Sequence, residues 1–99
     1  MSETFRDALH GRPVQFPLSV QRKVRMMHFD IAYLGASEVL AAVAQADLIR
    51  PDRKHRNRDV YFRRGVGPSS WLCVVVEYDC HQQGSVVTAF ARRRLPGWV

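Results

Sequence analysis

Residues 71–78 read Trp71-Leu72-Cys73-Val74-Val75-Val76-Glu77-Tyr78, and this stretch predicts a central β-strand. Aromatic and β-branched residues dominate it, as is typical of strands. Its segment Leu72–Val76 is apolar at every position, which indicates a strand with both faces buried. We therefore expect this strand to lie in the middle of a sheet, between two neighbours.

Two further strands are predicted, one before and one after it in the sequence. They span Asp59–Arg64 and Ser85–Arg92. The connecting segments, residues 65–70 and 79–84, are turn-rich and short enough for antiparallel hairpins. The three strands together predict an antiparallel meander.

The alternation of side chains along a strand predicts which residues share a face. With Phe62 facing the core, Tyr61 and Arg63 are expected on the open side of the sheet. On the last strand, Thr88 is expected to face the same way as Val86, Phe90 and Arg92.

Helical periodicity precedes the strands. Apolar residues at three- and four-residue steps predict a helix that ends at Gly35 and begins either after the cap Ser19 or nearer Met26. These residues are Val20, Val24, Met27, Ile31 and Leu34. A second helix is predicted from Glu38 to about Ala46, with Ser37 as its cap.

These elements predict an α+β fold in which N-terminal helices pack on one face of a three- to four-stranded antiparallel β-meander. The length of 99 residues fits a single domain, residues 1–99. Within it, we expect residues 1–18 to form an N-terminal arm or a short helix. Residues 19–94 are expected to form the helices and the sheet.

The charge of the chain is strongly positive and unevenly placed. Fifteen Lys and Arg residues outnumber nine Asp and Glu, which gives a net charge of +6 and a pI of about 10.2. The cations gather at residues 22–25, 50–64 and 92–94, whereas residues 26–49 contain none. This pattern favours RNA, DNA or an acidic protein as a partner. The candidate phosphate-binding residues are Arg50, Arg53, Lys54, Arg56, Arg58 and Arg92.

Other classes of protein are disfavoured by the sequence. It shows no secretory signal and no stretch near the roughly 20 apolar residues of a membrane span. Cys73 and Cys80 are expected on the order of 20 Å apart, too far for a disulfide, which favours a reduced, cytoplasmic protein. Motifs of phosphate loops, dinucleotide-binding folds, serine hydrolases and zinc proteases are absent. The adjacent Asp79, Cys80 and His81 lack the paired spacing of metal ligands, so neither a metal nor a cofactor is predicted.

A few side chains have the chemistry of a catalytic site. His28, beside the apolar stripe of the first helix, can reach the sheet as a general acid or base; the alternative is a structural histidine. Tyr61 and Arg63 can stack on a base and bind a phosphate, or they belong to an ordinary solvated strand face. Thr88 is either a polar site residue or simply a good strand former. Glu77 is expected to pair with a neighbouring arginine.

The order of the parts carries one resemblance. His28 is followed by Tyr33-Leu34-Gly35, Ala46-Asp47-Leu48-Ile49-Arg50-Pro51-Asp52, Asn57-Arg58-Asp59-Val60-Tyr61-Phe62-Arg63, Trp71-Leu72-Cys73-Val74-Val75-Val76-Glu77 and Val86-Val87-Thr88-Ala89-Phe90. This order resembles the small ribonuclease domains of the barnase/EndoU/colicin/RelE-like superfamily, over roughly residues 24 to 94. Such domains occur in toxin–antitoxin modules, polymorphic toxins and phage proteins.

The resemblance implies RNA cleavage without metal, by general acid–base catalysis in which the neighbouring 2′-hydroxyl attacks the phosphate. It implies His28 as the acid or base, Arg58 or Arg63 as the phosphate clamp, and Tyr61 and Thr88 as supporting polar groups. The candidate catalytic residues are thus His28, Tyr61, Arg63 and Thr88. Because no second histidine is expected opposite His28, either a Tyr or an Arg completes the acid–base pair or the fold lacks catalysis.

We therefore expect a toxin-like endoribonuclease that holds RNA against a basic sheet surface. One alternative is a non-catalytic nucleic-acid-binding module that uses the same surface. Another is a small interaction protein whose basic face docks an acidic partner. An antitoxin or immunity protein is a candidate partner, and the oligomeric state is left open.

Overall fold

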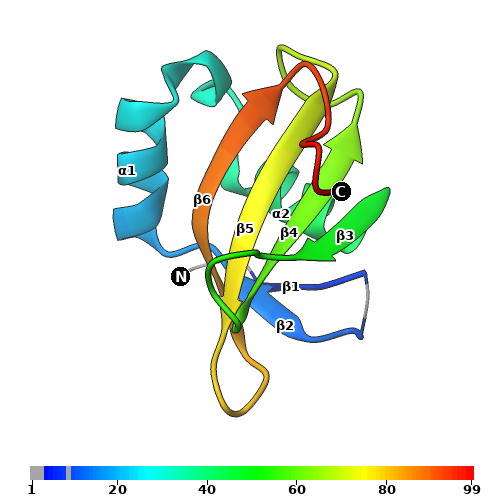
Figure 1. The fold of residues 1–99 in the computed structure, drawn as a ribbon. Helices are drawn as coiled ribbons and strands as arrows, with labels where there is room; N and C mark the ends of the chain where they lie inside the picture. The colour runs from blue at the N-terminus through cyan, green and yellow to red at the C-terminus, as the bar shows by residue number, and fades with distance from the viewer. Residues whose placement is uncertain (1–3, 9) are drawn as a thin grey trace.

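A six-stranded mixed sheet dominates the fold (Figure 1). The computed structural model describes residues 4–8 and 10–99. The strands are β1 (Thr4–Arg6), β2 (Pro13–Gln15), β3 (Leu48–Pro51), β4 (Arg58–Arg64), β5 (Trp71–Tyr78) and β6 (Gly84–Arg92). Their spatial order is β1-β2-β6-β5-β4-β3. β2 runs parallel to β6, and the other neighbouring pairs are antiparallel.

The prediction of helices on a three- to four-stranded antiparallel meander is therefore wrong. In the described part of residues 4–15, β1 and β2 form a hairpin that extends the sheet, in place of the predicted N-terminal arm or short helix. Each of these strands has only three residues, too few to show a period-2 pattern in the sequence. The parallel contact joins only Val14 to Gly84 and Gln15 to Ser85. β3, another strand that the sequence pattern did not reveal, pairs with β4 at the opposite edge.

The central strand has the bounds that its composition predicts. β5 spans Trp71–Tyr78 and pairs with β4 on one side and β6 on the other. Leu72, Val74 and Val76 belong to the core beneath the helices, whereas Cys73 and Val75 belong to a second cluster on the opposite face. The strand is apolar throughout because side chains cover both of its faces.

The first helix ends earlier than its periodicity predicts. α1 spans Leu18–Met27 and begins after Pro17 rather than after Ser19. His28 leaves the helical conformation at φ −132° and ψ 60°, and a 3₁₀ turn, η1 (Phe29–Ile31), follows. Ile31 and Leu34 still reach the core, so the apolar spacing continues although the α-helix does not.

The second helix begins and ends earlier than predicted, with Gly35 rather than Ser37 as its N-cap and Ala44 rather than Ala46 as its last residue. α2 spans Ala36–Ala44, and Gly35 is its N-cap. The Glu38 carboxylate accepts a hydrogen bond from the Gly35 backbone N–H at 3.5 Å, which supports the first turn.

No helix in residues 4–8 and 10–99 has the length and apolar character needed to cross a membrane.

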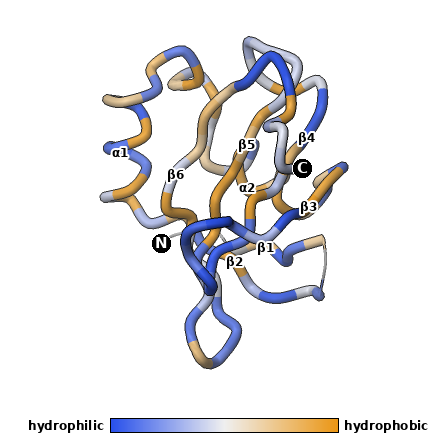
Figure 2. The backbone as a smooth tube through the Cα atoms, viewed as in Figure 1, coloured by the Kyte–Doolittle hydropathy of each residue, from blue (hydrophilic) through white to orange (hydrophobic). Residues whose placement is uncertain are grey.

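The helices cover one face of the sheet. α2 lies behind β4 and β5 in Figure 1, and α1 lies alongside β6. In Figure 2, β5 is mainly hydrophobic, whereas the segment between β3 and β4 and the β5–β6 turn are hydrophilic. The opposite face carries a smaller apolar cluster of Val60, Phe62, Cys73 and Val75, against which Leu95 and Val99 of the C-terminal segment pack.

A buried polar cluster fastens the β1–β2 hairpin to the sheet. Arg12 donates to the carboxylates of Asp7 at 3.0 Å and Asp59 at 2.8 Å, and its guanidinium lies 3.6 Å from the centre of the Tyr78 ring. The Tyr61 hydroxyl donates to Asp7 Oδ2 at 2.8 Å and shares a further hydrogen bond with the Tyr78 hydroxyl. We call these five residues the Arg12 cluster. The Asp7 side chain is fully buried, so its negative charge is stable there because Arg12 and Tyr61 donate hydrogen bonds to it.

Burial and hydrogen bonding shift the pKa values of Asp7, Tyr61 and Tyr78 in the Arg12 cluster. Burial alone would raise the pKa of Asp7, but hydrogen bonds from Arg12 and Tyr61 bring this pKa below its ordinary value. Burial raises the pKa of Tyr78 to about 12 and, together with a hydrogen bond to Tyr78, also raises the pKa of Tyr61. Asp7 is therefore held ionised and both tyrosines are held neutral over the ordinary pH range.

Replacing Arg12 with methionine should destabilise the fold strongly. The substitution keeps a long side chain but leaves the Asp7 carboxylate buried without its cation, which costs about 3–5 kcal/mol. The matched control is Arg58→Met, which removes the half-exposed ion pair with Glu77 and should cost about 0–1 kcal/mol. Urea denaturation of both variants measures the difference, and equal losses would contradict the importance of the Arg12 cluster.

The lowered pKa of Asp7 gives a second prediction, about the stability of the fold at acidic pH. Its stabilising contribution is complete above the unfolded-state pKa of about 3.9 and is lost as the pH falls through the lower folded-state pKa. We expect the free energy of unfolding of the wild type to fall more steeply below about pH 4 than that of Asp7→Asn. Denaturation at a series of pH values tests this, and parallel pH profiles would rule the prediction out.

Candidate nucleic-acid interface

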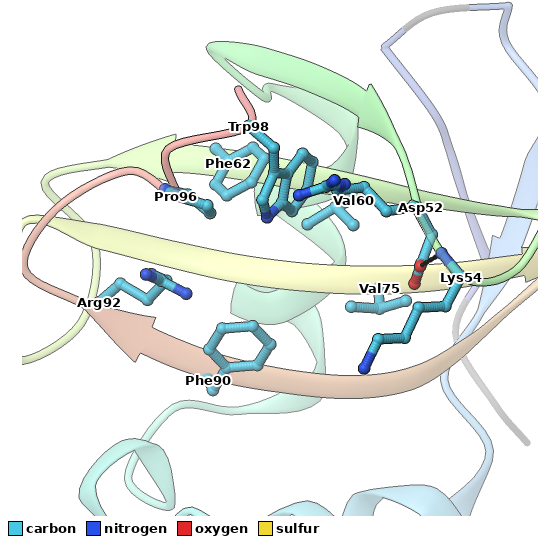
Figure 3. Close-up of a pocket in the computed structure, with 10 residues that line it drawn as sticks. Asp52, Lys54, Val60, Phe62, Val75, Phe90, Arg92, Pro96 and Trp98 are labelled. Atoms are coloured by element: carbon cyan, nitrogen blue, oxygen red, sulfur yellow. Dashed lines mark hydrogen bonds between the residues drawn. The ribbon is translucent and has the colours of Figure 1, made fainter.

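A groove opens on the face of the sheet away from the helices (Figure 3). Its volume is about 610 Å³. The lining comes from three strands, the segment after β3 and the C-terminal segment. The lining residues are Asp52, Arg53, Lys54, Val60, Phe62, Val75, Phe90, Arg92, Pro96 and Trp98.

Strand register explains why these side chains meet. Phe62 is opposite Cys73, which is opposite Phe90, so one row crosses β4, β5 and β6. Val60, Val75 and Thr88 form the next row. Side chains in such rows point to the same face of a sheet. The floor of the groove is consequently apolar and partly aromatic.

Trp98 adds a third ring to this floor. Its ring centre lies 6.3 Å from that of Phe62 at an interplanar angle of 60°, a tilted aromatic contact. Trp98 is 38% exposed, and Figure 3 shows it above the sheet beside Phe62. One side of the groove is thus formed by the C-terminal segment, which directly follows β6 in the sequence.

The rim of the groove is mainly basic. Arg53 and Lys54 come from the segment after β3, and Arg92 comes from the end of β6. Figure 3 shows Lys54 and Arg92 at the edges of the groove. Arg92 also lines a neighbouring hollow with Arg93 and Arg94. Asp52 is the carboxylate of the lining, and it accepts a hydrogen bond from the Lys54 backbone N–H at 2.8 Å. The local field favours an anionic ligand.

His28 lies at the β6 side of this face. It is half-buried at the end of α1, and its backbone N–H donates to Val24 O at 2.7 Å. Its ring centre lies 5.9 Å from that of Phe90. Thr88 and Arg92 flank Phe90 on the same face of β6, so the ring that His28 contacts lies between these two side chains.

Thr88 has the facing predicted with Phe90 and Arg92, but Val86 does not share it. Val75 pairs with Thr88 and Val76 pairs with Val86, so Val87 is an extra residue in a β-bulge. The bulge shifts the alternation by one position, which leaves Val86 in the core beneath the helices. The sequence pattern does not predict this β-bulge.

The predicted open-face positions of Tyr61 and Arg63 are wrong. Tyr61 is fully buried on the helix side within the Arg12 cluster. Arg63 Nη1 donates to Gln45 O at 3.1 Å and lies 3.4 Å from Asp47, also away from the groove. Phe62 faces the groove instead. The sequence alone does not show which of Tyr61 and Phe62 faces the helices and which faces the groove, because both are large aromatic residues and both are buried.

The other predicted phosphate-binding residues are divided between several places. Arg50 lies on the groove side by register, opposite Val60, and its Nη1 donates to Ile49 O. Arg58 forms an ion pair with Glu77 at 3.4 Å, as predicted for that carboxylate. Arg56 is exposed and lines a separate hollow with Arg12 and Asp59. The groove therefore gathers Arg53, Lys54 and Arg92 from the predicted set.

Three aromatic residues of the groove were not singled out from the sequence. Phe90 could have been found, because it shares a predicted face with Thr88. The sequence predicts that Phe62 faces the core beneath the helices, and Trp98 follows Pro96 and Gly97 in a stretch without periodicity.

No known protein family, curated protein or solved structure matches this chain.

Proposed function

We propose that this chain is a toxin-like endoribonuclease that binds single-stranded RNA in the groove and cleaves it without a metal ion. The observation that supports this best is a basic-rimmed aromatic groove with His28 at its edge. Aromatic rings stack on unpaired bases, and arginines beside them bind the phosphates. The reducing cytoplasm is the proposed location, where the free Cys73 and Cys80 persist as thiols.

The proposed binding mode follows from the two parts of the groove. Bases lie on the floor of Phe62, Phe90 and Trp98, and the backbone follows the cations of the rim. Base stacking contributes about 1–3 kcal/mol per base without sequence-specific hydrogen bonds. Single strands fit this arrangement better than duplexes, because the bases of a duplex are already stacked on one another.

The proposed reaction is an attack by a ribose 2′-hydroxyl on the adjacent phosphorus. The bond from phosphorus to the 5′-oxygen breaks, which leaves a 2′,3′-cyclic phosphate and a 5′-hydroxyl. The 2′-hydroxyl loses a proton and the leaving oxygen gains one, and His28 carries one of these transfers. Arg92 takes the role of phosphate clamp, because its guanidinium is on the same face as His28 whereas Arg63 is not. Thr88 supports the phosphate from the same strand.

A non-catalytic RNA-binding module is the second candidate. One observation favours it: Tyr61, the candidate catalytic tyrosine, is buried in the Arg12 cluster, away from His28 and the groove. Cleavage then requires the complementary proton transfer to come from water or from a residue of the rim. Binding and cleavage are therefore tested separately.

For binding, we expect Arg92→Gln to weaken the affinity for a single-stranded oligonucleotide and to reduce its salt dependence. Loss of one phosphate contact lowers the slope of log affinity against log salt by roughly 0.7. Fluorescence anisotropy with a 2′-O-methyl RNA, which resists cleavage, gives the slope. The control is Arg6→Gln in β1, which lies outside the groove and should leave the slope unchanged. Equal slopes for wild type and Arg92→Gln would contradict the proposed rim contact.

For cleavage, we expect wild-type protein to cut unstructured RNA in the presence of EDTA and to leave 2′,3′-cyclic phosphate ends. His28→Gln should reduce the rate by about 10²–10⁴-fold, the usual contribution of a general acid or base. The matched control is His81→Gln, in the exposed turn between β5 and β6. Gel analysis and mass spectrometry of the products measure both outcomes.

The possible results separate the two candidates. Salt-dependent binding without cleavage of several RNAs, with EDTA or with added divalent metal, would select the binding module. Cleavage that is unaffected by His28→Gln would exclude His28 as the proton carrier.

A further inference from the structure

Large exposed apolar side chains are concentrated at one corner of the molecule. Among the described residues, five of the six lie between Leu18 and Tyr33. They are Leu18 at 61% exposure, Met26 at 81%, Met27 at 68%, Phe29 at 80% and Tyr33 at 67%. We call these five residues the α1 patch. Soluble domains seldom expose so many large apolar groups close together without a binding function.

Helix geometry places part of the α1 patch in continuous ridges. Leu18, Arg22 and Met26 are spaced four residues apart and lie on one face of α1. Lys23 and Met27 form the adjacent ridge, while the opposite face of the helix buries Val24 in the core. Phe29 follows Met26 by three residues. The outer face of α1 is therefore an apolar surface with cations set into it.

The charges around the α1 patch are mostly of one sign. Arg22, Lys23 and Arg25 are exposed, and Asp30 is the one carboxylate between Leu18 and Tyr33. Among the described residues, none of the three cations has an ion-pair partner. A second copy of the chain would bring three more cations against these three. Charge complementarity instead favours an acidic partner.

We propose that the α1 patch docks an amphipathic segment of another protein that presents apolar side chains flanked by carboxylates. Met26, Met27 and Phe29 receive the apolar side chains, since methionines adapt their shape to a partner. Arg22, Lys23 and Arg25 pair with the carboxylates. An amphipathic helix laid along α1 offers anchors at the matching three- and four-residue steps.

Docking at this corner also bears on the groove. His28 lies in sequence between Met27 and Phe29, and its ring reaches Phe90 at the edge of the groove face. A partner seated on the α1 patch therefore covers the β6 side of that face and limits access to His28. This consequence rests on the proposed function, whereas the docking itself does not.

The experiment uses a synthetic helical peptide of about 20 residues, with leucines at three- and four-residue steps and glutamates beside them. The peptide is titrated into the isotope-labelled full chain, and NMR chemical shifts report the residues touched. One control peptide has the same composition in scrambled order, and another carries lysine in place of glutamate. Shifts at Met26, Met27 and Phe29 are expected with the acidic amphipathic peptide and not with the controls.

Substitutions then test the surface itself. Phe29→Ser and Arg22→Glu should each weaken peptide binding about tenfold or more, as expected for a central anchor and a reversed charge. Arg56→Glu reverses the charge of an exposed arginine elsewhere and should leave peptide binding unchanged. Thermal unfolding confirms that the variants fold, which their exposed positions favour.

Several results would overturn the proposal. The first is absence of peptide binding, and the second is equal binding by wild type, Phe29→Ser and Arg22→Glu. Self-association of the wild type that Phe29→Ser abolishes would identify a second copy as the occupant. Binding to anionic lipid vesicles without binding to the peptide would identify a membrane surface. Peptide binding is measured without RNA, so a failure of the proposed ribonuclease activity does not affect this test.

Discussion

The ion pair between Arg12 and Asp7 is the interaction on which the arrangement of the sheet depends. Both residues belong to the β1–β2 hairpin, Asp7 directly after β1 and Arg12 directly before β2. The contacts continue through Asp59, Tyr61 and Tyr78 to β4 and β5. A buried carboxylate is tolerated only when it is paired and hydrogen-bonded. The cluster meets this condition with side chains from the N-terminal hairpin and from β4 and β5, so the hairpin cannot leave the sheet without leaving a buried charge unpaired.

The same cluster determines the character of the opposite face. Because Tyr61 turns toward the helix side to bond Asp7, the alternation of β4 sends Val60 and Phe62 to the other side. These residues, with Val75 and Phe90, make the floor of the groove. Gly84, at the place where β2 joins β6, lies close to the Tyr78 ring of the Arg12 cluster. A Cβ added at Gly84 would lie 2.6 Å from Cε1 of Tyr78, so only glycine fits there without displacing the ring.

The parts of the fold that were predictable are those with long, regular patterns. β5 has the predicted bounds, and β4 and β6 each begin one residue before theirs. The ends of α1 and α2 were less accurate, because His28 and Gly35 change the backbone without changing the apolar spacing. The short strands β1, β2 and β3 were not predicted, because tertiary contacts rather than local composition give them their conformation.

The candidate site was partly predictable for the same reason. Thr88 and Arg92 share a face with Phe90, as the alternation predicts, and the basic segment after β3 supplies Arg53 and Lys54 to the rim. Tyr61 and Arg63 were misplaced, because polarity suggested the solvated face and the buried carboxylate that binds Tyr61 is 54 residues away. Trp98 reaches the groove only through the path of the C-terminal segment.

The β-bulge at Val87 divides β6 into two lengths with separate constraints. Residues before the bulge are held by the core and by the parallel contact with β2, whereas Thr88, Phe90 and Arg92 face the groove. Loss of one codon at this point would remove the extra residue and restore regular alternation without changing the face of any other side chain. Loss of a residue from either regular length would instead exchange the faces of everything that follows it, so Val87 marks the position at which this strand can change length without disturbing the core or the groove.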